Sequence, residues 1–237
     1  NIHAANLFMN SHFFIGTSAD HIGPISLGFV HDPHYLQPMS SGDNSSKRDK
    51  LSYEDIELLI NIERKTGISA ISWFSSKIWN NIKENYKSKP NLIPVYRYIL
   101  KQNMANFMFI LWTIQQKCKQ KGNMFLINNL LKNNFECFNY DYSFNANGEI
   151  IKKTLRHKTN SSKNEFDRYI RIAFDSVEEY NNKENRNLKN NLDNDDLECL
   201  NQICTLINKN YNENKIKNKL IDLIDTIQNK LIEKNIL

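Results

Sequence analysis

One run of the sequence constrains the fold more than any other. Residues 104–112, MANFMFILW, are apolar on nearly every side of a helix. A helix that is apolar all round has to be covered by other elements. We therefore expect it to lie at the centre of a helical bundle and to begin near Pro94, which suits the first turn of a helix. The run is too short to span a bilayer, and Arg97 and Lys101 precede it, so we expect no transmembrane segment.

Helical periodicity fills most of the sequence after residue 50. Ser52 begins a capping-box pattern with Asp55, and Gly67 suits the position just after a helix end. The pair Gly122-Asn123 is expected to separate the central helix from the next one. Apolar residues at helical spacing predict further helices from about residue 69 to the prolines at 90 and 94, and over about 124–134, 163–180, 193–207 and 214–234.

The periodicity changes from helical to alternating between residues 138 and 155. Phe138, Tyr140, Tyr142 and Phe144 alternate with small or polar residues, and Asn147-Gly148 follows. An Asn-Gly step beside such a run predicts a β-hairpin. A lone hairpin is marginal in water, so we expect this one to pack on the helices.

These patterns predict a mostly α fold. We expect an irregular bundle of about six to seven helices, a non-helical N-terminal arm and a small β-hairpin near 138–155. The predicted units are an extended Gly/Pro/His-containing arm over 1–46, a Trp-rich helical core with the hairpin over 47–155, and C-terminal amphipathic helices over 162–237 that pack on the core. Polar linkers are expected at 40–50 and 156–164.

The N-terminal arm differs in composition from the rest. It holds five of the six His, three of the five Pro and four of the seven Gly. The first basic residue is Lys47, so the three aspartates before it give the arm a charge of −3, and the remainder carries +8 to reach +5. The apolar run Phe13-Phe14-Ile15 needs to be covered by the helical body or by another chain.

The four cysteines show neither a CxxC pair nor zinc-type spacing. We expect reduced, mostly buried thiols. That expectation slightly favours an intracellular protein, and a secreted or exported mature chain stays open. The asparagine-rich composition is typical of an A+T-rich genome.

The arm also holds the main candidates for a metal site. His31, Asp32 and His34 place two imidazoles and a carboxylate within four residues, a ligand set that suits zinc or iron. Pro33 interrupts any helix that would align them, so the alternative is ordinary surface or interface histidines. Cys118, between two lysines, is a weaker candidate for a nucleophile because no base lies near it in sequence. Neither a serine-hydrolase elbow nor a P-loop is present, so we assign no catalytic residue and expect no cofactor.

The aromatic residues suggest a surface for a partner. Three tryptophans, Trp73, Trp79 and Trp112, fall in one dense aromatic region. Core packing explains such a cluster, and the alternative is an apolar groove that receives a partner helix. Together with the arm residues Phe13, Phe14 and Ile15, these tryptophans form the predicted interaction surface.

The leading functional hypothesis is a soluble, non-enzymatic protein–protein interaction module, such as a scaffold or a subunit of a larger complex. Its arm would bind another protein chain or a second copy of this one. The first alternative is a nucleic-acid-binding protein that uses the basic helices after residue 47. The second alternative is a metal-dependent enzyme built on the arm histidines.

Overall fold

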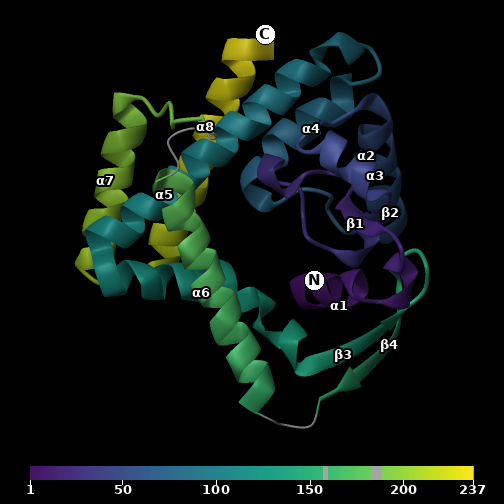
Figure 1. Ribbon diagram of the computed structural model, residues 1–237. Helices are drawn as coiled ribbons and strands as arrows, with labels where there is room; N and C mark the ends of the chain where they lie inside the picture. Colours follow the sequence, from purple (N-terminus) through teal and green to yellow (C-terminus); the bar gives the residue numbers. More distant parts are fainter. Residues whose placement is uncertain (157–159, 183–187, 237) are drawn as a thin grey trace.

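The computed structural model describes residues 1–156, 160–182 and 188–236. Within these ranges the chain is mostly helical, and its strands form two small antiparallel sheets of two strands each (Figure 1). The helices are α1 (Ile2–Met9), α2 (Ser41–Lys47), α3 (Tyr53–Thr66), α4 (Ser76–Asn85), α5 (Ile93–Leu126), α6 (Asn160–Asn182), α7 (Asn194–Asn208) and α8 (Glu213–Ile236). The strands are β1 (Ser18–His21), β2 (Leu36–Met39), β3 (Tyr140–Phe144) and β4 (Ile150–Leu155).

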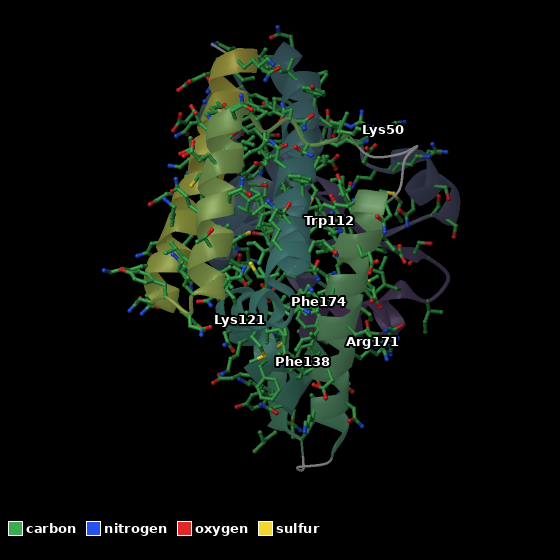
Figure 2. The ribbon with its side chains drawn as sticks, turned by 90° about the vertical axis from the view of Figure 1, so that its left-hand side faces the viewer. Lys50, Trp112, Lys121, Phe138, Arg171 and Phe174 are labelled. Carbon is green, nitrogen blue, oxygen red and sulfur yellow. The ribbon has the colours of Figure 1, made fainter. Side chains whose placement is uncertain are left out.

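The central helix is α5, as the apolar run predicts. It contacts α6, α7 and α8, and it lies between the α7–α8 pair and α6 (Figure 2). The main core is built around it and buries Ile99, Leu100 and Ile110 completely. Among the described residues, no helix is both long enough and apolar enough to cross a membrane.

Local capping signals place several helix ends. Ser52 and Asp55 form a reciprocal capping box at the start of α3, and Gly67 ends that helix with a φ of 71°. Asp193 and Asp196 form a second capping box at the start of α7. The predicted hairpin is confirmed as β3 and β4, with Gly148 at a φ of 75° in the turn.

The predicted break between two helices is displaced: it lies at Lys119 and not at Gly122-Asn123. Gly122 lies inside α5, where an added Cβ would come within 2.5 Å of the Ile114 carbonyl oxygen. The glycine therefore permits a close approach between the two parts of α5 on either side of its kink. The backbone leaves helical geometry earlier, at Lys119, which has a φ of 49°.

The N-terminal segment is more ordered than the expected extended arm. It forms α1 and the antiparallel pair β1–β2, and α2 occupies the expected linker at 40–50. Two clusters bury its apolar side chains. Leu27, Phe29 and Tyr35 belong to the main core, whereas Phe8 and Phe14 form a smaller cluster with Phe144. The segment thus packs on the chain's own helices.

The predicted division into three units stays a prediction. The main core draws residues from each of them, including Phe29, Trp79 and Ile224. Part of the predicted linker at 156–164, residues 157–159, lies outside the described residues.

Candidate active site

A compact unit of two strands and one helix brings together the polar residues of the N-terminal segment. Strands β1 and β2 pair with Asp20 opposite Gln37 and His21 opposite Leu36. After Ser40 the chain turns into α2, and the Ser40 hydroxyl accepts a hydrogen bond from the backbone N–H of Asp43, which caps the helix. We call β1, β2 and α2 the ββα unit.

One face of α2 is turned toward β1. Ser41, Asn44 and Lys47 recur every three residues and therefore share a side of the helix. The Ser41 hydroxyl lies 3.1 Å from that of Ser18, and the Lys47 ammonium reaches Asp20. Asn44 lies between Ser41 and Lys47 on this side of the helix.

Asp20 is a buried carboxylate in the middle of this contact, with only 6 % of its surface exposed. Its Oδ2 accepts hydrogen bonds from Lys47 Nζ at 2.7 Å and from Gln37 Nε2 at 2.9 Å. Lys47 also donates to the backbone carbonyls of His21 and Ile22, both at 2.9 Å, so all three of its protons are used. The ion pair fixes the end of β1 against α2.

His21 follows Asp20 and contacts a second imidazole. Its Nε2 lies 2.7 Å from Nδ1 of His31, and Nε2 of His31 lies 3.0 Å from the side-chain oxygen of Asn6. Burial lowers the pKa of His21. Burial, followed by repulsion from His21, lowers the pKa of His31 to about 4. Both rings are therefore neutral near pH 7, and a neutral imidazole can accept a proton.

Asp32 and His34 form a separate pair beside the unit. Asp32 Oδ1 accepts hydrogen bonds from the backbone N–H of His34 at 3.1 Å and from the His34 ring at 2.7 Å. Burial by itself raises the pKa of Asp32, but the hydrogen bonds from the His34 ring and backbone oppose it, and the pKa of Asp32 is lowered.

The three predicted metal ligands therefore take part in two separate interactions and do not converge on one point. His31 is turned toward His21, whereas Asp32 and His34 bind each other. The described residues contain no group of three or more His, Cys, Asp or Glu side chains that could hold a metal ion. The zinc or iron site at His31, Asp32 and His34 stays a prediction.

The predicted interaction residues are spread over different environments. Phe13 and Phe14 pack against Phe8, while Ile15 is 80 % exposed. Trp79 is fully buried, and its indole N–H donates to Glu63 at 2.9 Å. The other two tryptophans lie elsewhere: Trp73 packs edge-on against Phe107, and Trp112 lies beside Phe109 on α5. Binding of a partner chain through these residues stays a prediction.

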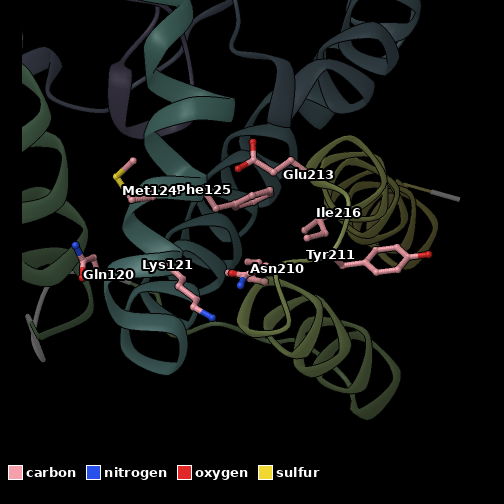
Figure 3. A pocket seen from close by; sticks show the side chains of 9 residues that line it. Gln120, Lys121, Met124, Phe125, Asn210, Tyr211, Glu213 and Ile216 are labelled. Carbon is pink, nitrogen blue, oxygen red and sulfur yellow. The ribbon is translucent and has the colours of Figure 1, made fainter.

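Two pockets of the described residues are alternative sites. One, of about 340 Å³, lies between α5 and the α7–α8 turn, where Phe125 and Ile216 line it together with Lys121 and Glu213 (Figure 3). Its lining residues include one carboxylate, from Glu213, but no histidine or cysteine. The pocket therefore lacks the groups that general acid–base or nucleophilic catalysis needs. The other pocket, also about 340 Å³, adjoins the ββα unit, and His34 and Gln37 line it. The ββα unit and its neighbouring pocket are therefore the stronger candidate.

Sequence reasoning missed Asp20, His21, Asn44 and Lys47. The usable signal was an acidic residue directly followed by a histidine, with a polar helix-forming stretch downstream. The strands are only four residues long, and the second contains Pro38. Neither strand therefore has a recognisable sequence pattern, and the site between them could not be predicted.

Comparison with protein families decides which class of protein this is. The model of a family described as "Type II restriction endonuclease (RE_Alw26IDE)" matches residues 10–236. The chain belongs to this family. The match includes all of the ββα unit and excludes α1. No curated protein and no solved structure matches the chain.

The family corrects the leading functional hypothesis. A non-enzymatic interaction module, scaffold or complex subunit is wrong, because the family is one of DNA-cleaving enzymes. The site contains no contiguous catalytic motif that would identify an enzyme from the sequence alone. In this type II restriction endonuclease homologue the polar groups meet only when β1, β2 and α2 pack together.

Proposed function

We propose that the chain is a DNA endonuclease whose catalytic site is the ββα unit, with His21 as the general base. The observation that carries this proposal is the position of the His21 imidazole, which follows Asp20 of the Asp20–Lys47 pair and lies within hydrogen-bond distance of His31, inside the residues that match the endonuclease family. A nuclease needs a proton acceptor for water and groups that neutralise charge at the phosphate.

The chemistry is hydrolysis of a phosphodiester bond. A water oxygen forms a bond to phosphorus while the bond from phosphorus to the leaving sugar oxygen breaks. His21 accepts the proton that the water loses. The leaving oxygen takes a proton from solvent, so the products are a phosphate monoester and a free hydroxyl.

Asp20 and Asn44 are the side chains that would hold a divalent cation. Mg²⁺ is commonly bound through one or two carboxylates and keeps sites for water and substrate phosphate. Oxygen donors of this kind fit that preference, and the described hydrogen bonds to Asp20 both end on Oδ2, which leaves Oδ1 as a ligand. When bound, such a cation would polarise the phosphoryl group and stabilise the leaving oxygen.

Cations next to the unit would contact the DNA backbone. Arg48 and Lys50 follow α2 directly and are both exposed. Lysine and arginine contacts to phosphate position a protein on a duplex and carry no sequence information themselves. The first alternative hypothesis was nucleic-acid binding by the basic helices after residue 47. The present proposal places part of that binding at Arg48 and Lys50.

The first test is cleavage of DNA by the wild-type chain and two variants. Plasmid DNA of varied sequence is incubated with MgCl₂, with MnCl₂ or with EDTA, and the loss of supercoiled substrate is timed. We expect wild-type cleavage only with a divalent cation. His21→Ala and Asp20→Asn should each slow it by at least about 100-fold, the usual contribution of a general base or of its electrostatic partner.

The matched control is His12→Ala, which removes an exposed histidine of the same segment outside the ββα unit. It should cleave as fast as wild type. A wild-type chain that binds but does not cleave DNA under these conditions, or a His21→Ala variant with wild-type rate, contradicts the proposal. Binding without cleavage would return the chain to the nucleic-acid-binding alternative.

A further inference from the structure

Three polar side chains from separate elements form a line that ends at His21. Asn6 comes from α1, His31 from the loop before Asp32, and His21 from the end of β1. The two hydrogen-bond distances are 3.0 Å from Asn6 to His31 and 2.7 Å from His31 to His21. The rings of His21 and His31 are 5.0 Å apart and tilted by 45°.

Asn6 determines which atom donates and which accepts in each of these two hydrogen bonds. The side-chain oxygen of Asn6 can only accept, so the proton on His31 must be on Nε2. A neutral imidazole carries one N–H, so Nδ1 of His31 is an acceptor. It follows that Nε2 of His21 donates to His31, and that the lone pair of His21 is on Nδ1.

We infer that His31 and Asn6 are positioning residues that hold the His21 ring in place and keep its Nδ1 free to accept a proton. This inference rests on the proposed role of His21 as general base. The triad of serine hydrolases follows the same logic, in which a third group fixes the tautomer of the base. Here the final group is a neutral amide, so the line sets the tautomer without favouring a charged ring.

A comparison with His34 shows that the hydrogen bonds of His31 are specific to that residue. His34 lies in the same segment but uses the carboxylate Asp32 as its partner. His31 is adjacent to Asp32 in sequence and nevertheless directs both ring nitrogens elsewhere, to His21 and to Asn6. The Asn6 side chain is exposed, so it does not contribute to packing of the core.

The first measurement is the tautomer of His21 in the full chain. Long-range ¹H–¹⁵N correlation spectra of ¹⁵N-histidine protein at neutral pH distinguish a protonated Nε2 from a protonated Nδ1. His21→Gln identifies the His21 signals by their loss. We expect a proton on Nε2 of His21 in the wild type. Asn6→Ala and His31→Ala should each give a mixture of tautomers, and Asn6→Asp, which keeps the acceptor oxygen, should restore the single form.

The second measurement is the kinetics of DNA cleavage. We expect Asn6→Ala and His31→Ala to lower kcat on the order of 10- to 100-fold, as loss of an orienting partner commonly does, with KM for DNA unchanged. Asn6→Asp should recover most of the rate. Because the Asn6 side chain is exposed, Asn6→Ala keeps the inference testable even if His31→Ala folds poorly.

The outcomes separate the two proposals. A wild-type His21 with its proton on Nδ1, or an Asn6→Ala variant with unchanged tautomer and kcat, overturns the positioning role. The expected tautomer in a chain whose His21→Ala variant still cleaves DNA overturns the general-base assignment instead.

Discussion

At the scale of single residues, the buried His3 makes the free energy of unfolding depend on pH. Only 5 % of the residue's surface is exposed, its ring lies 5.1 Å from that of Phe138, and its Nε2 lies 3.0 Å from the carbonyl oxygen of Tyr140. Burial lowers its pKa, and the charge of Arg156 lowers it further. As pH falls below 6.5, the unfolded chain therefore binds a proton at His3 before the folded chain does. The linkage relation then predicts that the free energy of unfolding decreases as the solution is acidified.

We expect His3→Gln to weaken this pH dependence. Glutamine keeps an N–H donor for Tyr140 and does not titrate. The measurement is urea unfolding at pH 7.5 and pH 5.5, where wild type should lose more stability than the variant. His12→Ala is the control, since His12 is exposed and should leave the loss as in wild type. An equal loss in wild type and His3→Gln would show that His3 does not contribute.

At the scale of elements, the β3–β4 hairpin is tied to the candidate site by its turn. Gly148 has a φ of 75°, and an added Cβ would lie 2.4 Å from the backbone oxygen of Pro33, one residue before His34. A Gly148→Ala variant therefore meets both an unfavourable backbone conformation and a steric clash. We expect it to lose roughly 2–4 kcal/mol of unfolding free energy.

Gly67→Ala separates those two contributions. Gly67 has a φ of 71°, and nothing lies within 4 Å of its would-be Cβ, so the variant meets the backbone cost alone, about 1–2 kcal/mol. Denaturant melts of the two variants should differ by the cost of the clash. Gly148→Ala should also slow DNA cleavage because the displaced turn shifts the His34 segment. Equal destabilisation by the two substitutions would mean that the contact with Pro33 is readily relieved.

The same elements explain what the sequence could and could not predict. Helix α3 and the β3–β4 turn were predictable because Ser52, Gly67 and Gly148 act locally, within a few residues. Strands β1 and β2 were not, because their pairing joins residues 15 to 21 positions apart across a loop that contains two prolines. The site depends on that pairing, so Asp20 and Lys47 could not be recognised as partners in advance.

At the scale of the whole molecule, Gln228 joins the last helix to a helix from the first half of the chain. Its side chain is fully buried on α8, and Oε1 accepts hydrogen bonds from the backbone N–H groups of Lys77 at 3.0 Å and Ile78 at 3.5 Å. These are early residues of α4, whose own N-cap residue, Ser75, makes no capping hydrogen bond with its side chain. The cap of α4 therefore comes from a residue about 150 positions away, which makes the stability of α4 depend on α8.

Removing this cap tests whether the two halves unfold together. Gln228→Ala leaves buried donors at the start of α4 without an acceptor, and we expect a loss of roughly 1–3 kcal/mol in the free energy of unfolding. Gln202→Ala, which truncates an exposed glutamine on α7, should change it by less than about 0.5 kcal/mol. Hydrogen exchange should report faster opening of the Lys77 and Ile78 amides, together with weaker protection along α8. Faster exchange at α4 with unchanged protection of α8 would instead mean that the cap is local, and that the N-terminal half holding the ββα unit is stable without the C-terminal helices.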